Sequence, residues 1–259
     1  MTIAREYFHK VLSPWVPGVS NPLPQLAREL ARPDGTAVDV GCGPGVFLCY
    51  LAQLFGRVVA IDRDPDMIEA AGELVETLRR HGAELGEVEL RCEDWAECDD
   101  VRGADLVCAV NSILETDGER RHRMLGALQR ALSPDRGATL LAIFPAMEAQ
   151  IHLLRLYAAE LARLGASAEV IERQIEAEFL TAHHFDALEG TFSSRDETPQ
   201  KFFYELELAF ELERAGFDVS EMARVVYPWE VCRAVDAGYF PGEVELYDWF
   251  VRASPSSLR

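Results

Sequence analysis

An aspartate and three closely spaced glycines form the segment of this chain whose residue types best suit ligand binding. They lie between a predicted buried strand and a predicted helix, in Val38-Asp39-Val40-Gly41-Cys42-Gly43-Pro44-Gly45. Glycines let the backbone turn sharply and approach a ligand without side-chain collision. The helix that follows supplies free N–H groups nearby. The segment therefore predicts a loop that holds a cofactor.

The glycine spacing argues against two common nucleotide cofactors. A dinucleotide loop follows GxGxxG, whereas the glycines at 41, 43 and 45 follow GxGxG, and Val46 stands where the last glycine would be. A phosphate loop of the Walker type needs Gly-Lys-Ser/Thr, which this chain lacks. NAD and ATP are therefore poor fits.

Predicted strands and helices alternate around this loop. We predict buried strands at 37–40, 57–61, 88–92, 105–110 and 138–144. Asp64, followed by Pro65, predicts the N-cap of one intervening helix, and Asp117 predicts the N-cap of another. This alternation indicates a parallel sheet whose right-handed crossovers place helices on both faces.

The alternation stops after Pro145. Residues 147–200 are dominated by helical periodicity and are too long for an ordinary connection. A lid over the substrate and a dimerisation surface both explain this stretch, and we favour the lid. Residues 201–215 return to an amphipathic helix, and 217–227 with 244–251 predict two closing strands, expected to pair as an antiparallel hairpin.

The cofactor loop resembles that of the class I, Rossmann-like S-adenosylmethionine-dependent methyltransferase family. The resemblance covers roughly residues 36–145 and, more loosely, the closing strands. Asp39, Gly41, Gly43 and Gly45 match the family pattern acidic-x-Gly-x-Gly-x-Gly, which encloses Cys42. In the family this loop wraps the methionyl and ribose parts of the cofactor. The resemblance thus implies S-adenosylmethionine as cofactor and S-adenosylhomocysteine as product.

The resemblance also implies contacts at the next two strand ends. Asp62 ends the second strand, where an acidic residue accepts hydrogen bonds from both ribose hydroxyls, and Arg63 and Met67 follow where the family contacts adenine. Asp94 fits the family's acceptor for the adenine amino group, beside Trp95. On their own, Asp62 could be a neighbour of a helix cap, Asp94 a turn residue and Trp95 a core anchor.

The implied methyl-transfer site follows the fourth strand, where the backbone of Asn111 would line it. Candidates for a general base are His183, His184 and Glu115. The two histidines lie in the 147–200 insertion, where a histidine is more often a surface or capping residue, and Glu115 could equally start a turn. A general base is optional, because amines need only lose a proton, whereas hydroxyls benefit from a general base.

These elements predict an α/β fold with a doubly wound, mostly parallel seven-stranded sheet and helices on both faces. An antiparallel closing strand and a helical insertion after strand five complete it. We expect a helical cap at 1–35, a Rossmann-like S-adenosylmethionine-binding core at 36–146 and 201–259, and the insertion, as lid or interface, at 147–200.

No metal site is expected. Metal-dependent catechol-type chemistry would need clustered carboxylates after strand five, and residues 143–147 offer none. The six cysteines form no CxxC pair, and reduced structural thiols are favoured over disulfides or zinc. They are Cys42, Cys49, Cys92, Cys98, Cys108 and Cys232.

The formal net charge of -19 disfavours nucleic acid as a partner, because such a field repels phosphates. The alternative is that the acidity only aids solubility. No apolar run is long enough to span a bilayer, and residues 1–10 lack the apolar core of a secretory signal. We expect a cytoplasmic protein with a small-molecule substrate and no membrane partner; a homodimer stays open.

The favoured function is transfer of a methyl group to a small-molecule acceptor by in-line displacement. Because a fold does not determine a function, two alternatives stay open. One is a non-methylating S-adenosylmethionine-binding protein on the same fold. The other is a protein methyltransferase.

Overall fold

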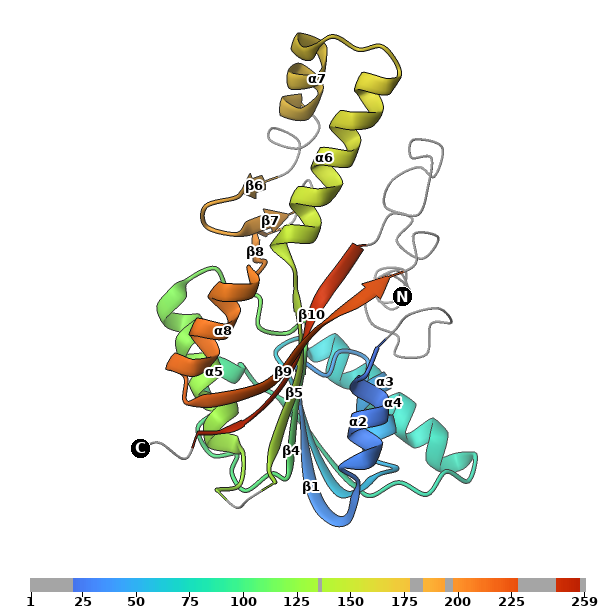
Figure 1. Cartoon of the computed structure of the whole chain (residues 1–259). Coiled ribbons are helices and arrows are strands. Elements are labelled where there is room, and N and C mark those ends of the chain that lie inside the picture. The colour runs from blue at the N-terminus through green and yellow to red at the C-terminus, as the bar shows by residue number, and fades with distance from the viewer. Residues whose placement is uncertain (1–20, 135–136, 178–183, 194–197, 228–245, 257–259) are drawn as a thin grey trace.

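A seven-stranded sheet forms the centre of the computed structural model, which describes residues 21–134, 137–177, 184–193, 198–227 and 246–256. Its order is β3-β2-β1-β4-β5-β10-β9 (Figure 1). β1 to β5 pair in parallel, β10 runs antiparallel to β5, and β9 runs antiparallel to β10. The strands are β1 Arg32–Val40, β2 Phe55–Asp62, β3 Glu87–Cys92, β4 Leu106–Val110, β5 Thr139–Pro145, β9 Phe217–Tyr227 and β10 Leu246–Pro255. The predicted fold class, including the closing hairpin, is confirmed.

Helices cover both faces of this sheet, because its central strands bury side chains on both sides. In β5, Leu140, Ala142 and Phe144 join the core on the face of α5 and α8, whereas Leu141 and Ile143 join the core on the face of α2, α3 and α4. Figure 1 shows the two helix layers on either side of the sheet. The helices are α2 Leu23–Glu29, α3 Val46–Leu51, α4 Pro65–Arg80, α5 Gly118–Ala131 and α8 Glu205–Arg214.

Two helix starts lie where the sequence predicts them. The side chain of Asp64 accepts a hydrogen bond from the backbone N–H of Asp66 at the start of α4. The side chain of Asp117 accepts one from Arg120 at the start of α5. Both caps satisfy N–H groups that have no partner inside the helix. Each helix follows the carboxyl end of a strand, β2 for α4 and β4 for α5.

Two element boundaries differ from those predicted. β1 begins at Arg32, inside the expected 1–35 cap, because Arg32 pairs with Phe55 before a register shift. The helix predicted from residue 201 begins at Glu205, because Lys201 belongs to a short strand. The part of the cap that the structure describes holds α2, and residues 1–20 lie outside it.

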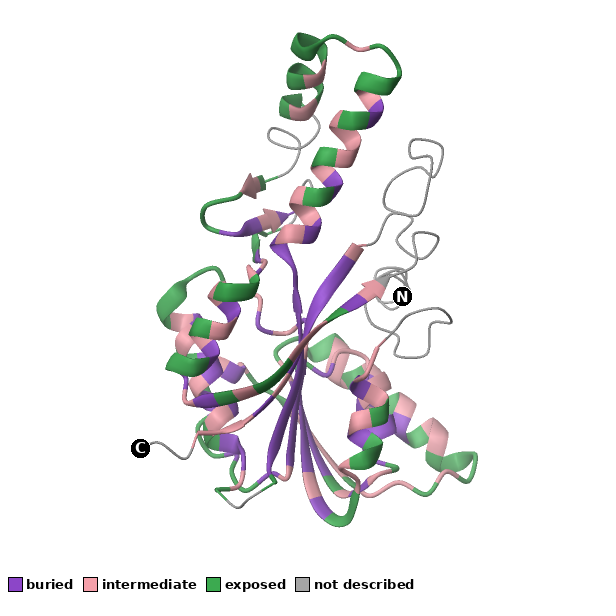
Figure 2. Ribbon diagram, viewed as in Figure 1, coloured by how far each residue is buried: buried purple, intermediate pink, exposed green. Residues whose placement is uncertain are grey.

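The insertion after β5 is helical only in its first half. α6 Met147–Arg163 and α7 Ala168–Ile175 form an arm that projects from the sheet, and Figure 2 colours most of α7 as exposed. A small antiparallel sheet follows, where no strand is predicted. Its strands are β6 His184–Asp186, β7 Thr191–Ser193 and β8 Gln200–Lys201. Edge-to-face stacking of Phe192 with Phe185 and Phe202 accounts for its formation.

The described cysteines are all free thiols. Cys42, Cys49, Cys98 and Cys108 are buried, whereas Cys92 is exposed because it ends the edge strand β3. The strand predicted to be buried at 88–92 is therefore exposed at Cys92, and Cys232 lies outside the described residues. Within the described part of the chain, no helix has both the length and the apolar character that a bilayer crossing demands.

Candidate functional site

A cavity of about 580 Å³ opens at the carboxyl ends of the central strands. Open α/β sheets bind ligands at this edge, and the volume falls within the range typical of small-molecule sites. The residues predicted to contact a cofactor line it, apart from Gly45. They are Asp39, Gly41, Cys42, Gly43, Asp62, Arg63, Met67, Asp94, Trp95 and Asn111.

The glycine loop takes a backbone shape that only glycine adopts easily. Gly41, Gly43 and Gly45 have φ angles of 70°, 51° and 85°. A Cβ on Gly41 would lie 2.3 Å from Cβ of Ser112, and one on Gly45 would lie 2.9 Å from Ala71. A Cβ on Gly43 would meet nothing within 4 Å. Gly41 and Gly45 thus allow close packing, whereas Gly43 leaves bare backbone beside the cavity.

Alanine substitutions should separate these two roles. Gly41→Ala is expected to destabilise the fold by about 2–4 kcal/mol, because it combines left-handed strain with a clash. Gly43→Ala is expected to cost only about 1 kcal/mol of stability but to weaken binding of a ligand that covers the loop. Urea unfolding and calorimetric titration of both variants measure the two effects. Equal stability losses would contradict the assignment.

Asp39 carries a buried carboxylate with one unsatisfied oxygen. Its side chain lies under the start of α3, where the backbone of Leu48 donates to it, and Oδ2 has no hydrogen-bond partner among the described residues. Burial, with a smaller repulsion from Asp62, raises the pKa of Asp39 from 3.8 to about 7. An acceptor that stays unsatisfied in a cavity wall indicates a place for a cationic or hydrogen-bond-donating group.

Asp62 ties the glycine loop to the start of α4. Oδ2 accepts from the backbone N–H of Gly43 at 2.9 Å, and Oδ1 accepts from that of Asp64 at 2.9 Å. Each carboxylate oxygen has a second lone pair. The side chain is therefore held in one orientation and still offers acceptors to paired hydroxyls of a ligand.

Asp94 has partners within the protein. Oδ1 caps the 3-10 turn η1 (Trp95–Glu97) by accepting from the N–H of Ala96, and Oδ2 pairs with Arg120. Arg120 also pairs through Nε with Glu115 at 2.8 Å. Trp95 is buried and donates from Nε1 to the carbonyl of Met124 at 3.1 Å, as expected of a core anchor. Arg120, which sequence reasoning missed, therefore links the ends of β3 and β4 across the cavity wall.

The three candidates for a general base lie in different places. Glu115 lines the cavity, with one oxygen paired to Arg120 and the other accepting from the N–H of Asp117 at 3.2 Å. His184 lies in β6, where Nε2 is 2.9 Å from Oγ1 of Thr191, and it does not line the cavity. His183 lies outside the described residues. Of the described candidates, the structure brings only Glu115 to the cavity.

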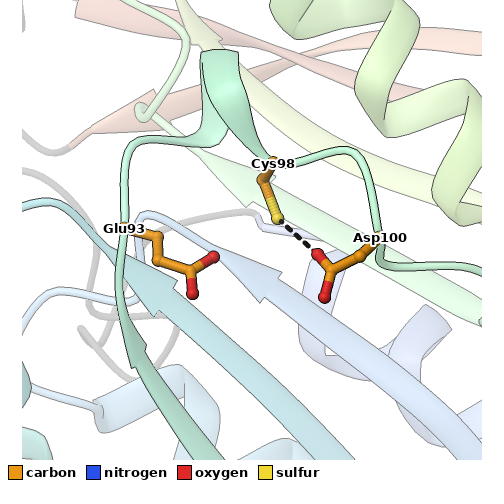
Figure 3. Close-up of side chains that lie close together, drawn as sticks. All are labelled: Glu93, Cys98 and Asp100. Atoms are coloured by element: carbon orange, nitrogen blue, oxygen red, sulfur yellow. Dashed lines mark hydrogen bonds between the residues drawn. The ribbon is translucent and has the colours of Figure 1, made fainter.

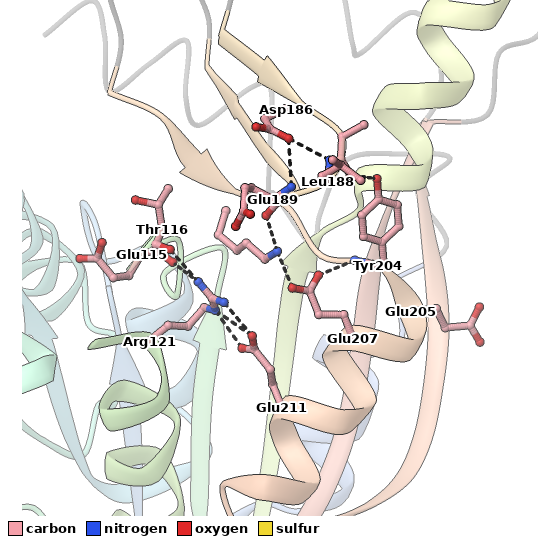
Figure 4. A network of polar contacts seen from close by, with 12 residues as sticks. Glu115, Thr116, Arg121, Asp186, Leu188, Glu189, Tyr204, Glu205, Glu207 and Glu211 are labelled. Carbon is pink, nitrogen blue, oxygen red and sulfur yellow. Dashed lines mark hydrogen bonds and ion pairs between the residues drawn. The ribbon is translucent and has the colours of Figure 1, made fainter. Parts of the chain in front are cut away.

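A buried polar network holds the small sheet against the loop after β4 (Figure 4). Arg121 forms a bidentate pair with Glu211 and donates to the carbonyls of Glu115 and Thr116. In the same network, Lys201 is 2% exposed, and its Nζ lies 2.6 Å from Oε1 of Glu207. A lysine so fully buried needs partners of this kind.

The end of the insertion reaches the cavity through this network. The backbone N–H of Lys201 donates to the carbonyl of Leu114 at 2.9 Å. Thr198, Pro199 and Gln200 then line the cavity beside Leu114. The sequence contained one signal that could have drawn attention to Lys201, because it is one of only two lysines in the chain.

Glu93, Cys98 and Asp100 form the one acidic and thiol cluster of metal-ligating type in the described ranges (Figure 3). Asp100 pairs with Arg91 at 2.8 Å, and the thiol of Cys98 donates to Asp100 at 3.5 Å. Burial and the nearby carboxylate raise the pKa of Cys98 to about 11. A metal ion would need the thiolate of Cys98 and free carboxylate oxygens. We therefore interpret the cluster as a group of side chains that hydrogen-bond to one another and not as a metal site.

Comparison with known proteins agrees with this geometry. Residues 37–135 match the family model described as "Methyltransferase domain". An uncharacterized 37.1 kDa protein in a Streptomyces fradiae transposon is 43% identical over 61 residues, which are 22% of this chain and 18% of that protein. The match thus spans about a fifth of that relative's length.

Solved structures share the fold. A structure titled as an S-adenosylmethionine-dependent methyltransferase from Methanosarcina mazei has a TM-score of 0.61 and 16% identity, covering 89% of this chain and 97% of that chain. The 1,6-didemethyltoxoflavin-N1-methyltransferase of Burkholderia thailandensis, with its substrate and S-adenosylhomocysteine bound, has a TM-score of 0.54 and 14% identity, covering 92% and 80%.

Proposed function

We propose that this chain, whose residues 37–135 match a methyltransferase domain, transfers a methyl group from S-adenosylmethionine to a small-molecule acceptor. The observation that carries the proposal is that Asp39, with its unsatisfied Oδ2, and the bare backbone of Gly43 line the same cavity. This pairing suits a ligand that brings a positive group against the carboxylate and lies flat over the loop.

The described residues fit the parts of the cofactor. Asp39 and the glycine loop would hold the methionyl part, and Asp62 would accept from the ribose hydroxyls. Arg63 and Met67 line the cavity where the adenine would lie, together with Glu93. Because Asp94 already pairs with Arg120, it would share its carboxylate with this arginine when it meets the adenine amino group.

The chemistry of the site would then rest on position more than on acid–base groups. When bound, S-adenosylmethionine would supply a methyl group on a sulfonium, and an acceptor lone pair would attack this methyl carbon in line with the carbon–sulfur bond. Holding the acceptor in that line supplies roughly 7–11 kcal/mol. Glu115 is paired with Arg120, so its role as a base would require that pair to open.

A small, uncharged or cationic acceptor suits the cavity best. Its volume of about 580 Å³ must hold the cofactor as well as the acceptor, and the chain's net charge of -19 disfavours polyanions. The similar structure from Burkholderia thailandensis is a 1,6-didemethyltoxoflavin-N1-methyltransferase with that small molecule bound. We propose that residues 147–200 act as a lid, supported by the place of Thr198 to Gln200 in the cavity wall.

The decisive experiment is calorimetric titration of the whole chain with S-adenosylmethionine and S-adenosylhomocysteine. Wild type should bind both saturably, and Asp62→Ala should weaken both about 100-fold. The variant loses the ribose acceptors and also the two backbone hydrogen bonds that shape the loop.

Asp66→Ala is the matched control. Asp66 is an exposed aspartate in the first turn of α4 that does not line the cavity, so its loss should leave affinity unchanged. Absence of binding by wild type, or equal affinities of Asp62→Ala and wild type, would contradict the proposed cofactor site. Screening of acceptors by release of S-adenosylhomocysteine follows once binding is established.

A further inference from the structure

Asn111 has an unusual backbone conformation at the end of β4. Among the described residues other than glycine it alone has a positive φ, of 46°. Its side chain is buried, its backbone N–H donates to the carbonyl of Ile143 at 2.8 Å, and the residue lines the cavity. A strained, buried polar residue in a cavity wall is the kind of position that function retains.

The amide of Asn111 is held in one orientation by a residue far away in the sequence. Nδ2 donates to Oδ2 of Asp248 in β10 at 2.9 Å, and both residues are buried. This hydrogen bond places the NH2 side of the amide toward Asp248. Oδ1 of Asn111 then has no partner among the described residues. A buried acceptor left in this way costs free energy until a ligand donates to it.

The sheet order places this amide on the side of the cavity away from the cofactor loop. β4 lies between β1, which carries Asp39, and β5, with β10 next beyond β5. The Asn111 amide therefore extends from β4 across the end of β5 toward β10. Leu114, three residues after Asn111, and Gln200 line the same cavity, and the backbone N–H of Lys201 donates to the carbonyl of Leu114.

We propose that Oδ1 of Asn111 accepts a hydrogen bond from the N–H or O–H of the acceptor nucleophile, and that Asp248 is the residue that positions it. The proposal rests on the methyltransferase function above and narrows the acceptor to amines and hydroxyls. The hydrogen bond fixes the direction of the donor's lone pair. As the new bond to the methyl carbon forms, the carbon–sulfur bond breaks, sulfur keeps the electron pair, and the acceptor's proton passes to water.

Two cofactor analogues test this without knowledge of the acceptor. S-adenosylhomocysteine has no group at the position of the transferred methyl. Sinefungin carries an amino group there, and is otherwise closely similar. If Oδ1 of Asn111 faces the transfer point, sinefungin gains a hydrogen bond that S-adenosylhomocysteine lacks. The readout is the ratio of the two dissociation constants, which a general loss of structure does not change selectively.

Two variants remove the proposed hydrogen bond in different ways. Asn111→Gly deletes the amide and tolerates the positive φ. Asp248→Asn brings an NH2 group that can donate to Oδ1 of Asn111 and so occupy it. Both variants should weaken sinefungin binding about tenfold relative to S-adenosylhomocysteine binding, because a hydrogen bond to a charged donor is lost. Asp218→Asn, an exposed aspartate in β9, is the matched control and should leave the ratio unchanged.

An unchanged ratio in Asn111→Gly, or equal weakening of both analogues, would overturn the proposal, since Asn111 would then contact neither analogue or only their shared part. If circular dichroism shows that Asn111→Gly does not fold, the ratio in Asp248→Asn decides in the same way. Failure of wild type to bind S-adenosylhomocysteine would instead count against the cofactor site, which keeps the two failures distinct.

Discussion

Asp39→Asn should make the ligand-free protein more stable at pH 8 while weakening its binding of S-adenosylmethionine. The carboxylate of Asp39 is buried, and its pKa is raised from 3.8 to about 7, first by burial and then by Asp62. An ionised group in such a place lowers the free energy of unfolding. Asparagine removes the negative charge that the ligand's positive group would meet and replaces one carboxylate oxygen with an NH2 donor.

The difference in unfolding free energy between Asp39→Asn and wild type should depend on pH. A pKa raised on folding means that the native state binds the proton more tightly, so the stability from that group is full below about pH 4 and is lost as pH rises to 7. The variant has no such loss. Its advantage in unfolding free energy should therefore grow between pH 4 and 7, reach a few kcal/mol, and stay level above pH 7.

Urea unfolding of both proteins from pH 4 to 8 measures this difference. Titration with S-adenosylmethionine over pH 6 to 8 measures the effect on binding. Wild-type affinity should fall as pH drops below 7, and the variant should bind about 10–100-fold more weakly at pH 8. A difference in unfolding free energy that does not change with pH would contradict the assignment of the raised pKa to Asp39.

Arg121→Met should cost about 3–5 kcal/mol of stability, because it breaks a buried ion pair from one side only. The side chain of Arg121 is 8% exposed and that of Glu211 is 17% exposed. The substitution leaves the Glu211 carboxylate without its bidentate partner and deprives two carbonyls, of Glu115 and Thr116, of their donor. The loop after β4 would lose these two hydrogen bonds to α5.

Chemical denaturation followed by tryptophan fluorescence measures the loss. Arg123→Met is the matched control, because Arg123 is exposed on the same helix and should change stability by less than about 0.5 kcal/mol. The double variant Arg121→Met with Glu211→Met should be more stable than Arg121→Met alone, since no charge is left unpaired. A loss below about 1 kcal/mol in Arg121→Met would show that this network contributes little to the fold.

The sequence by itself determined the fold class and the place of the cofactor loop. Strand periodicity, glycine spacing and the helix caps at Asp64 and Asp117 are local properties, because each depends on residues only a few positions apart. The order of parallel strands then brings their carboxyl ends to one edge. For that reason Asp39, Asp62 and Asn111 could be predicted to lie together before any contact was known.

Only the tertiary structure decided what these side chains do. Three contacts join segments that are distant in the sequence. Arg120 pairs with Asp94, Asp248 orients Asn111, and the backbone of Lys201 holds the end of the insertion at the cavity. Likewise the raised pKa of Asp39 arises first from burial and then from Asp62, a residue of the next strand and not a neighbour in the chain. Local sequence patterns do not predict such partners, because burial and pairing of side chains arise only when the helices have packed against the sheet.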